Sequence, residues 1–124
     1  MIGIDLVAIE RITRLRERFG NKALEKFLDQ EEIALIKNDS SMAGFYAAKE
    51  AISKALGLGI SAQCGFFDIK IYKDSKNAPY FTLSKHLIDH YEITDMSLSI
   101  AHHFGFAIAV AVIEGRKETR QLWH

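Results

Sequence analysis

The sequence lacks several features that mark particular classes of protein. Its 124 residues include one cysteine, Cys64, so no internal disulfide can form, and no Cys or His pair near it has the spacing of a zinc site. The longest apolar run, from Phe104 to Ile113, is about half of the ~20 residues that cross a bilayer. The sequence also has no repeats, low-complexity tracts or linkers, which predicts a single domain over residues 1–124.

Charge of either sign is not in excess. Sixteen Lys and Arg residues balance sixteen Asp and Glu residues, which argues against nucleic-acid binding and against a polybasic membrane anchor. Asp5 stands too early for a secretory signal peptide, and no small-residue cleavage site follows it. We therefore expect a cytoplasmic protein, and its 48% of apolar residues is ordinary for a folded soluble chain.

Hydrophobic spacing predicts a short strand and two short helices at the start of the chain. Residues 2–7 form an apolar run of strand length, and helical spacing of Ile, Leu and Phe predicts a helix over residues 9–19. Asp29 stands three residues before Glu32, as in a capping box, and opens a helix that continues to Ile36.

The clearest predicted helix lies in the middle of the chain. Ser40 or Ser41 can cap it, and it runs to Leu56, where Gly57 ends it. Its small side chains would allow another element to pack closely against the helix. These are Ala43, Ala47, Ala48, Ala51 and Ala55.

The second half of the chain predicts strands. The stretch FDIKIYK alternates, DSKNAP is a turn cluster and YFTL is a second strand. Ser84 can cap a short helix, and residues 96–101 and 104–113 predict a closing pair of strands. The fold class predicted is α+β, with an antiparallel sheet packed against a long central helix.

The last strand has two apolar faces of different size. Small residues on one face suit the alanines of the long helix, whereas the other face carries Phe106, Ile108, Val110 and Val112. Both faces should be covered. Either a second subunit or a folded-over part of the chain's own sheet could cover the large face, and the sequence does not choose between them.

The long helix also holds AAKEAISKALGLG, in which Glu50 and Lys54 stand four residues apart. One interpretation is an exposed pair worth about 0.3–0.5 kcal/mol. The other is a small polar site on a core helix, because Lys49, Glu50, Ser53 and Lys54 are its few polar residues and fall on one stretch.

Asp5 raises a related question, since it stands in an apolar strand and charged groups are rarely buried without a partner. Asp5 and Glu50 are isolated carboxylates in apolar segments, and together they suggest a hard cation such as Mg²⁺. Mg²⁺ is often held by one or two carboxylates, with waters and substrate phosphates as its other ligands. Lys54 would face the same phosphates. No Cys/His set competes for a softer metal.

The histidines and arginines each allow two interpretations. His86 and His90 are spaced as a metal pair, but without a third ligand a solvated face is the simpler interpretation. His102 ends a predicted strand, which suits a site residue. Lastly, a basic stripe on the first helix is either solvated, with Glu10 paired to Arg14, or a docking strip for an acidic partner: Arg11, Arg14 and Arg18.

Three motifs resemble those of the holo-acyl-carrier-protein synthases, the small bacterial family of the 4′-phosphopantetheinyl transferase superfamily. The G-I-D opening matches residues 3–5, and R-I follows at residues 11–12. The helix motif matches Phe45 to Gly59, FYAAKEAISKALGLG, and is specific. Ser99-Ile100-Ala101-His102, followed by an aromatic–Ala strand, matches the C-terminal motif. The order and length of the chain agree throughout.

The resemblance implies a 4′-phosphopantetheinyl transferase fold and transfer of 4′-phosphopantetheine from coenzyme A to a serine of apo acyl carrier protein, in support of fatty acid biosynthesis. It assigns Mg²⁺ to Asp5 and Glu50, which with Lys54 would be catalytic. The coenzyme would be bound by Lys54, His102, Ser53 and Pro79. The family also implies carrier docking on the arginine strip and a homotrimer with sites between subunits.

This chain departs from the family pattern at two places. The usual G-K-P turn that meets the nucleotide is Asn77-Ala78-Pro79, and the second Ser of S-I-S-H is Ala101. Neither departure changes the expected metal or phosphate groups.

Two other functions fit the same elements. A thioesterase acting on coenzyme A thioesters also has a long helix on an antiparallel sheet, but its hydrolysis usually needs no Mg²⁺. A non-catalytic module would bind coenzyme A or a phosphate ligand and consume nothing. Sensitivity to chelators and turnover of coenzyme A separate these alternatives from transfer.

Overall fold

The computed structural model describes residues 1–117, so residues 118–124 of the predicted single domain lie outside the described part. The helices are α1 (Ile9–Phe19), α2 (Asn21–Glu25), α3 (Gln30–Leu35), α4 (Asp39–Ala55) and α5 (Lys85–Tyr91), with a 3₁₀ turn η1 (Phe66–Asp68). The strands are β1 (Ile2–Ala8), β2 (Ile69–Lys73), β3 (Pro79–Leu83), β4 (Ile93–His103) and β5 (Phe106–Gly115).

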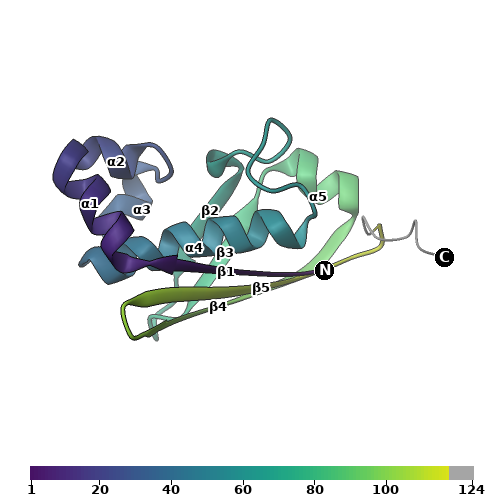
Figure 1. Ribbon diagram of the computed structural model, residues 1–124. Helices are drawn as coiled ribbons and strands as arrows, with labels where there is room; N and C mark the ends of the chain where they lie inside the picture. Colours follow the sequence, from purple (N-terminus) through teal and green to yellow (C-terminus); the bar gives the residue numbers. More distant parts are fainter. Residues whose placement is uncertain (118–124) are drawn as a thin grey trace.

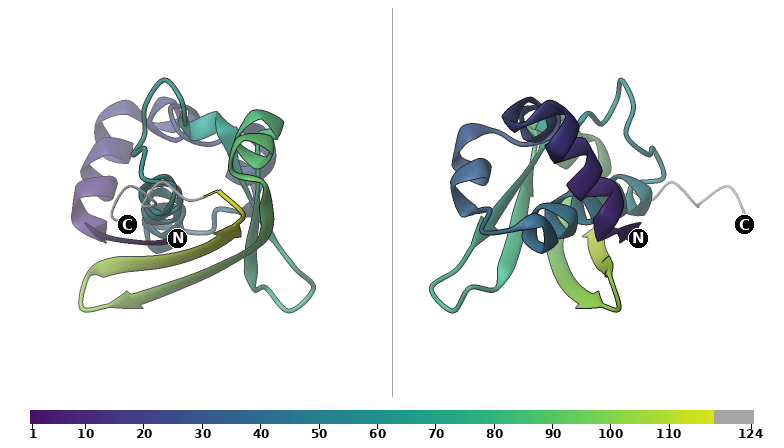
Figure 2. Two further views of the ribbon diagram at one scale, coloured as in Figure 1. Left: turned by 90° about the vertical axis from the view of Figure 1, so that its right-hand side faces the viewer. Right: turned by 60° about the vertical axis from the view of Figure 1, so that its left-hand side comes forward.

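Helix α4 is the axis around which the other elements pack (Figure 1). On one side lies an antiparallel sheet in the order β1-β5-β4, and a separate antiparallel hairpin of β2 and β3 stands beside β4. Helices α1, α2 and α3 gather near the N-terminal end of α4, and α5 lies near its other end (Figures 1 and 2). The predicted α+β class, an antiparallel sheet on a long central helix, is confirmed.

Small residues let the sheet approach α4 closely. Ala107, Ala109 and Ala111 of β5 are fully buried against the helix. On β1 the contact is closer still, because a Cβ added at Gly3 would overlap the backbone of Ala51 in α4. The close packing predicted from the alanines is therefore present, and Gly3 is needed because any side chain there would push β1 away.

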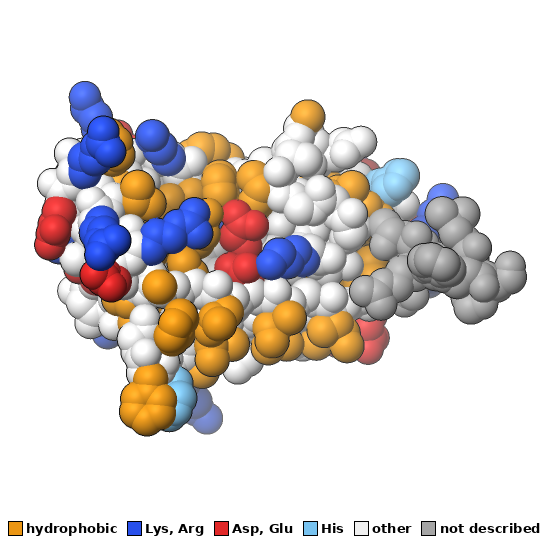
Figure 3. Space-filling view, in the orientation of Figure 1, with side chains coloured by type: hydrophobic (Ala, Val, Ile, Leu, Met, Phe, Trp, Pro, Cys, Tyr) orange, Lys and Arg blue, Asp and Glu red, His pale blue; other side chains and the backbone are white. Residues whose placement is uncertain are grey.

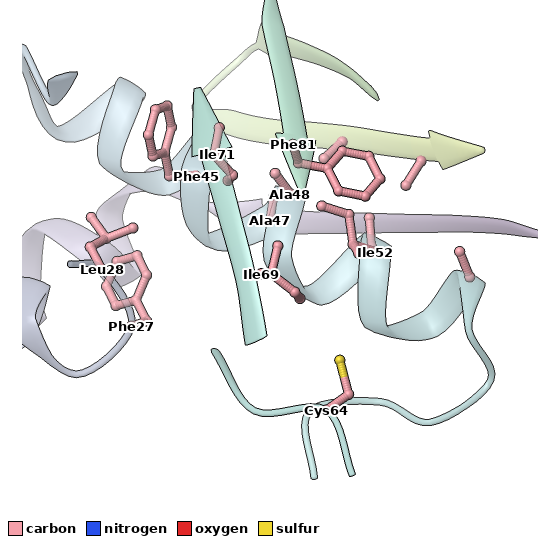
Figure 4. Close-up of a cluster of buried hydrophobic side chains, with 14 of the residues drawn as sticks. Phe27, Leu28, Phe45, Ala47, Ala48, Ile52, Cys64, Ile69, Ile71 and Phe81 are labelled. Carbon is pink, nitrogen blue, oxygen red and sulfur yellow. The ribbon is translucent and has the colours of Figure 1, made fainter. Parts of the chain in front are cut away.

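The hydrophobic core lies between α4, the α2–α3 region and the β2–β3 hairpin (Figure 4). Phe45 and Ile52 from α4 and Ile71 from β2 all belong to this core and are buried. Cys64, in the loop after α4, is also fully buried, and burial raises the pKa of its thiol to about 11. The structure therefore makes the single cysteine part of the core.

The outer face of the three-stranded sheet is not covered by any element within residues 1–117 (Figure 2). Ile2, Ile4 and Leu6 of β1 are 58–63% exposed, and Phe106 of β5 is 41% exposed. The β2–β3 hairpin buries its apolar side chains toward α4 instead, because Ile69, Ile71, Phe81 and Leu83 belong to the core. Coverage of the large face by the chain's own sheet is therefore wrong for the described residues.

Several predicted boundaries need correction. Asn38, not Ser40 or Ser41, caps α4: its Oδ1 accepts from the Ser41 backbone N–H at 2.8 Å, while Ser41 completes the capping box. Ser84 precedes α5, but its hydroxyl donates to Asp68 at 2.7 Å rather than capping the helix. Helix α2 was not predicted. The capping box of Asp29 and Glu32 and the glycine stop after α4 are confirmed.

Candidate functional site

The structure brings Asp5, Glu50 and Lys54 to one side of the contact between β1 and α4. Asp5 lies on the face of β1 that turns toward the helix, since its neighbours Ile4 and Leu6 face outward. The Lys54 ammonium Nζ lies 2.7 Å from Asp5 Oδ1. Glu50 is one turn earlier on α4. Lys54 is therefore paired with Asp5 rather than with Glu50, and the charges of Asp5, Glu50 and Lys54 act on one another as a group.

Gly3 is the reason that Asp5 reaches the helix. The overlap that a Cβ at Gly3 would have with Ala51 and Ala55 fixes how close β1 lies to α4, and Asp5 is two residues further along the same face. Alternation along the strand then points the carboxylate at the polar edge of the helix. In Figure 3 acidic and basic side chains meet over the middle of this face, above a band of hydrophobic side chains.

Electrostatics in this group favour an additional cation. Burial raises the pKa of the Glu50 carboxyl, and the negative charge of Asp5 raises it further, while Tyr46, Lys54 and Arg11 partly offset both effects. Its hydrogen bond to Asp5 raises the pKa of Lys54. Two carboxylates therefore repel each other beside a single ammonium group, which is the condition that a divalent cation would relieve.

The chemistry of the donors suits a hard metal ion that keeps other ligands. Asp5 and Glu50 supply carboxylate oxygens, which Mg²⁺ prefers. Within residues 1–117 no group of three or more His, Cys, Asp or Glu side chains could hold a metal. A cation at this place would therefore need waters or substrate phosphates to complete its shell, as Mg²⁺ usually does.

Tyr46 is a site residue that the sequence reasoning missed. It precedes Glu50 by one turn of α4, and burial raises the pKa of its hydroxyl, which the charge of Glu50 raises further and the charge of Arg11 lowers. The Arg11 guanidinium carbon lies 5.6 Å from the centre of the Tyr46 ring. Rings of Phe27 and Phe66, at 5.3 and 5.9 Å, hold the tyrosine on its other sides. The signal available was its i, i+4 spacing to Glu50.

Lys49 does not belong to the polar site, contrary to the interpretation of the helix's polar stretch. Its ammonium is fully buried and donates to Phe27 O at 2.7 Å, Glu32 Oε1 at 2.9 Å and Phe66 O at 3.0 Å. Adjacent residues on a helix point about 100° apart, so Lys49 faces the core while Glu50 faces the site. Lys49 is a structural residue.

Ser53 is also turned inward. It is fully buried, and its hydroxyl donates to Glu50 O at 2.7 Å. Its assignment to coenzyme binding stays a prediction, and in this structure the hydroxyl is used by the helix itself.

His102 and Pro79 lie in a different part of the chain from Asp5. His102 is on β4, across β5 from β1, and its imidazole Nε2 lies 2.8 Å from Ser40 O at the start of α4. Pro79 opens β3 opposite Lys73 on β2. The structure therefore does not bring these two predicted coenzyme contacts together with the carboxylates of the same chain.

Two lysines add positive charge near Pro79. Lys73 Nζ stands 5.8 Å from the Phe45 ring centre, and burial lowers the pKa of Lys73, which the charge of nearby Lys37 lowers further. Neither ammonium has an acidic partner among the described residues. Like charges held together without a carboxylate are a feature that suits an anionic ligand.

The arginine strip lies on the exposed side of α1. Arg14 pairs with Glu10 at 2.6 Å, as one interpretation predicted, but both side chains are 74% exposed, so the pair is weak. Arg11 reaches over Tyr46, and Arg18 lies over Phe19. Between α1 and α4 an apolar pocket opens beside the strip, lined by Leu15, Phe19, Phe27, Tyr46 and Phe66 among others.

Comparison with known proteins identifies the family of the chain. A family model described as the 4′-phosphopantetheinyl transferase superfamily matches residues 1–111. The chain belongs to this superfamily. Similar proteins include the holo-[acyl-carrier-protein] synthases of Campylobacter curvus, 55% identical over 91% of this chain and 99% of the relative, and of Helicobacter pylori, 53% identical over 95% and 100%.

Solved structures of phosphopantetheinyl transferases share the fold. The H. pylori synthase in complex with coenzyme A has a TM-score of 0.88, is 53% identical and is covered completely, while 92% of this chain is covered. A Neisseria meningitidis synthase, 32% identical, gives 0.82 with coverage of 91% of this chain and 96% of that one. The predicted transferase fold is thus confirmed.

His86 lies beside groups of its own chain. His86 Nε2 lies 3.1 Å from Gln63 O, and its Nδ1 lies 4.0 Å from Asp68, so a backbone carbonyl and one carboxylate occupy it. The described residues supply no third ligand that would make a metal site of His86 and His90.

None of the helices described here is both long and apolar enough to cross a membrane.

Proposed function

We propose that the protein transfers 4′-phosphopantetheine from coenzyme A to a serine hydroxyl of apo acyl carrier protein. The serine oxygen bonds to the pantetheine-bearing phosphorus, the phosphoanhydride bond breaks, and adenosine 3′,5′-bisphosphate leaves. The observation that carries the proposal is the group of Asp5, Glu50 and Lys54, which close packing of β1 on α4 brings together at the surface. The relatives reported above are holo-acyl-carrier-protein synthases.

Asp5 and Glu50 would hold Mg²⁺, whose charge would balance the negative charge that grows on the pyrophosphate as the bond breaks. Glu50 would take the proton of the carrier serine, directly or through a water. Lys54, which is half exposed, would stabilise the leaving phosphate. Positioning of the reactants and electrostatic stabilisation would contribute most to the rate, because the protein itself takes little part in the covalent chemistry of phosphoryl transfer.

We also propose that the coenzyme is bound between subunits of a homotrimer. His102, Pro79 and the lysines Lys37 and Lys73 stand apart from the carboxylates of their own chain, so they would serve a neighbouring copy's site. The uncovered apolar face of the sheet supports this, since contiguous exposed apolar residues are typical of interaction surfaces. Such an interface would cover the large face of β5.

The acidic carrier protein would dock on the strip of Arg11, Arg14 and Arg18. The apolar pocket beside the strip would receive an apolar side chain of the carrier, while the arginines steer the encounter. We place the reaction in the cytoplasm, as the sequence predicted.

The deciding experiment mixes the purified protein with apo acyl carrier protein, coenzyme A and Mg²⁺ and weighs the carrier by intact mass spectrometry. A gain of one phosphopantetheine that EDTA abolishes supports transfer. Asp5→Ala and Glu50→Ala should each remove the gain while circular dichroism stays unchanged. An unchanged carrier mass would contradict the proposal. Thioester hydrolysis insensitive to EDTA would then indicate a thioesterase, and coenzyme A bound without turnover would indicate a binding module.

A further inference from the structure

Helix α1 has little apolar packing for an element that carries the arginine strip. Of its eleven residues, all in the described part of the chain, Ile12 alone is buried. Leu15 and Phe19 have the spacing of a core-facing stripe, yet both are exposed at the edge of the apolar pocket between α1 and α4. Burial of apolar surface therefore contributes little to the position of this helix.

Space lies on both sides of the line along which α1 meets α4. The apolar pocket lies on one side. A second hollow lies on the other side and is lined by Arg16, Asp39 and Met42 among others. Met42 of α4 also lines the first pocket, so α1 rests on α4 over Met42 and has room to tilt in either direction.

The start of α1 is fixed, whereas the rest of the helix is less constrained. Ile9 directly follows the last residue of β1, and its backbone N–H donates to Gly105 O at 2.9 Å. From there α1 rises past α4 (Figure 1). A tilt of α1 would therefore pivot about Ile9, and the displacement would grow along the helix toward Arg14 and Arg18.

One carboxylate ties the middle of α1 to α4. Asp39, in the first turn of α4, accepts from Arg16 Nε at 2.6 Å and Nη2 at 3.1 Å, and from the Thr13 hydroxyl at 2.9 Å. The hydrogen bond from Arg16 lowers the pKa of Asp39, so the carboxylate stays ionised near neutral pH. Exposed ion pairs usually contribute little, but a bidentate pair with a third donor has a defined geometry.

The position of α1 also sets how the arginine strip stands relative to the carboxylate site. Arg11 reaches over the ring of Tyr46, which is one turn before Glu50 on α4. A protein bound on the strip is therefore placed relative to Glu50 by the tilt of α1. A misplacement of reacting groups by about 1 Å can lower a rate 10²-fold.

We propose that Asp39 is a positioning residue that fixes the tilt of α1 through Thr13 and Arg16, and so places the docked carrier protein at Glu50. The proposal rests on the proposed function for the identity of the partner and of the reaction. It adds that the strip depends on its orientation as well as on its charge.

The sign of one effect separates orientation from charge. Asp39→Asn removes a negative charge beside the strip and releases Arg16, so by charge alone an acidic carrier protein should bind more tightly. If Asp39 fixes the tilt, the same substitution should make the carrier a poorer substrate. The two explanations therefore predict opposite changes.

Two further variants complete the comparison. Asp89→Asn makes the same change of charge on α5, where Asp89 pairs with Lys85 at 2.6 Å, and is the matched control. Thr13→Val removes one of the three hydrogen bonds to Asp39 without changing the charge. Circular dichroism and urea denaturation check that each variant is folded under the assay conditions.

Hydrogen exchange followed by mass spectrometry measures how firmly α1 is held. We expect peptides that cover α1 to exchange at least tenfold faster in Asp39→Asn than in the unaltered protein, and at an unchanged rate in Asp89→Asn. In the transfer assay, kcat/KM for the carrier should fall at least fivefold for Asp39→Asn and about twofold for Thr13→Val. It should stay unchanged for Asp89→Asn, and KM for coenzyme A should stay unchanged in all three.

Several results would overturn the proposal. A carrier used as well or better by Asp39→Asn would show that the strip acts by charge alone. Unchanged hydrogen exchange over α1 would show that other contacts hold the helix. Equal losses for the carrier and for coenzyme A would indicate a general loss of structure.

Calorimetric titration with apo acyl carrier protein in EDTA separates this proposal from the transfer reaction itself, because it needs no turnover. If the unaltered protein transfers nothing but binds the carrier, weaker binding by Asp39→Asn still supports the role of Asp39 in docking. A carrier that does not bind the unaltered protein would overturn the docking strip, and the role of Asp39 with it.

Discussion

Helix α4 carries two lysine–carboxylate pairs that have nearly the same length and opposite surroundings. Lys49 Nζ lies 2.9 Å from Glu32 Oε1, and both side chains are buried. Lys54 Nζ lies 2.7 Å from Asp5 Oδ1, but half of the lysine side chain is exposed. Distance alone does not distinguish the two pairs.

What distinguishes them is how many hydrogen-bonding groups remain free. The three N–H groups of Lys49 have three acceptors, and Glu32 also accepts from the backbone N–H groups of Asp29 and Ile71. Lys54 has one acceptor among the described residues, and beside it burial and the charge of Asp5 raise the pKa of Glu50. The buried pair joins distant segments of the fold, whereas the exposed pair keeps N–H donors free, as the proposed phosphate-binding role of Lys54 requires.

The largest effect should come from breaking the buried pair. Lys49→Met leaves the Glu32 carboxylate buried without its positive partner and Phe27 O without its donor, so we expect the free energy of unfolding to fall by about 3–5 kcal/mol. Urea denaturation followed by circular dichroism measures this loss. A Lys49→Met protein as stable as the unaltered chain would show that the pair is not structural.

The same substitution at the exposed pair should separate activity from stability. Lys54→Met should change the free energy of unfolding by less than about 1 kcal/mol, because exposed ion pairs contribute little. We expect its transfer rate to fall about 10²-fold through loss of a charge that stabilises the leaving phosphate. Rates from the mass assay and urea curves on one preparation test both halves; a large stability loss with normal turnover would reverse the assignment.

Removing the charge of Glu50 should stabilise the metal-free protein. Its pKa is raised in the folded state, so the ionised carboxylate opposes folding above the unfolded value of 4.5, and native stability rises as pH falls through the raised pKa. Glu50→Gln lacks this cost. We expect a gain of the order of 1 kcal/mol near neutral pH that shrinks in acid. Melting curves in EDTA at two pH values measure it, and a Tm unchanged at neutral pH would contradict it.

The smallest effect should come from the hydroxyl of Tyr46. Tyr46→Phe keeps the ring among Phe27 and Phe66 but removes the hydroxyl whose pKa responds to Glu50 and Arg11. We expect kcat to fall a few-fold, with KM for coenzyme A unchanged, because losing one polar neighbour of Glu50 should cost about 1 kcal/mol. Steady-state kinetics with varied coenzyme A test this, and a change confined to KM would place Tyr46 in binding instead.

Much of the fold could be predicted because its signals are local. The alternation of FDIKIYK, the Asp29–Glu32 capping box and Gly57 after α4 each act within a few residues, and the structure has them where expected. Asp5, Glu50 and Lys54 were first grouped because they are isolated charged residues in apolar segments, and the motifs of the family then assigned them the same roles. Gly3 explains physically why the first motif needs a glycine.

Which polar residues of α4 face the core and which face the site could not be predicted, because their partners are distant in the sequence. Lys49 is matched by Glu32 and by carbonyls of Phe27 and Phe66, none of which periodicity could bring to it. The cap of α4 was missed for a different reason, since Asn38, Ser40 and Ser41 are all good caps and only the backbone path chooses among them.

The buried cysteine can serve as a probe of local opening of the fold. Cys64 is the only thiol in the chain, it has no exposed surface, and its raised pKa keeps it protonated near neutral pH. A thiol-specific reagent can therefore react only with molecules in which the loop after α4 has opened to solvent. The rate of labelling would measure how often this loop opens, and a ligand that binds beside α4 should lower that rate.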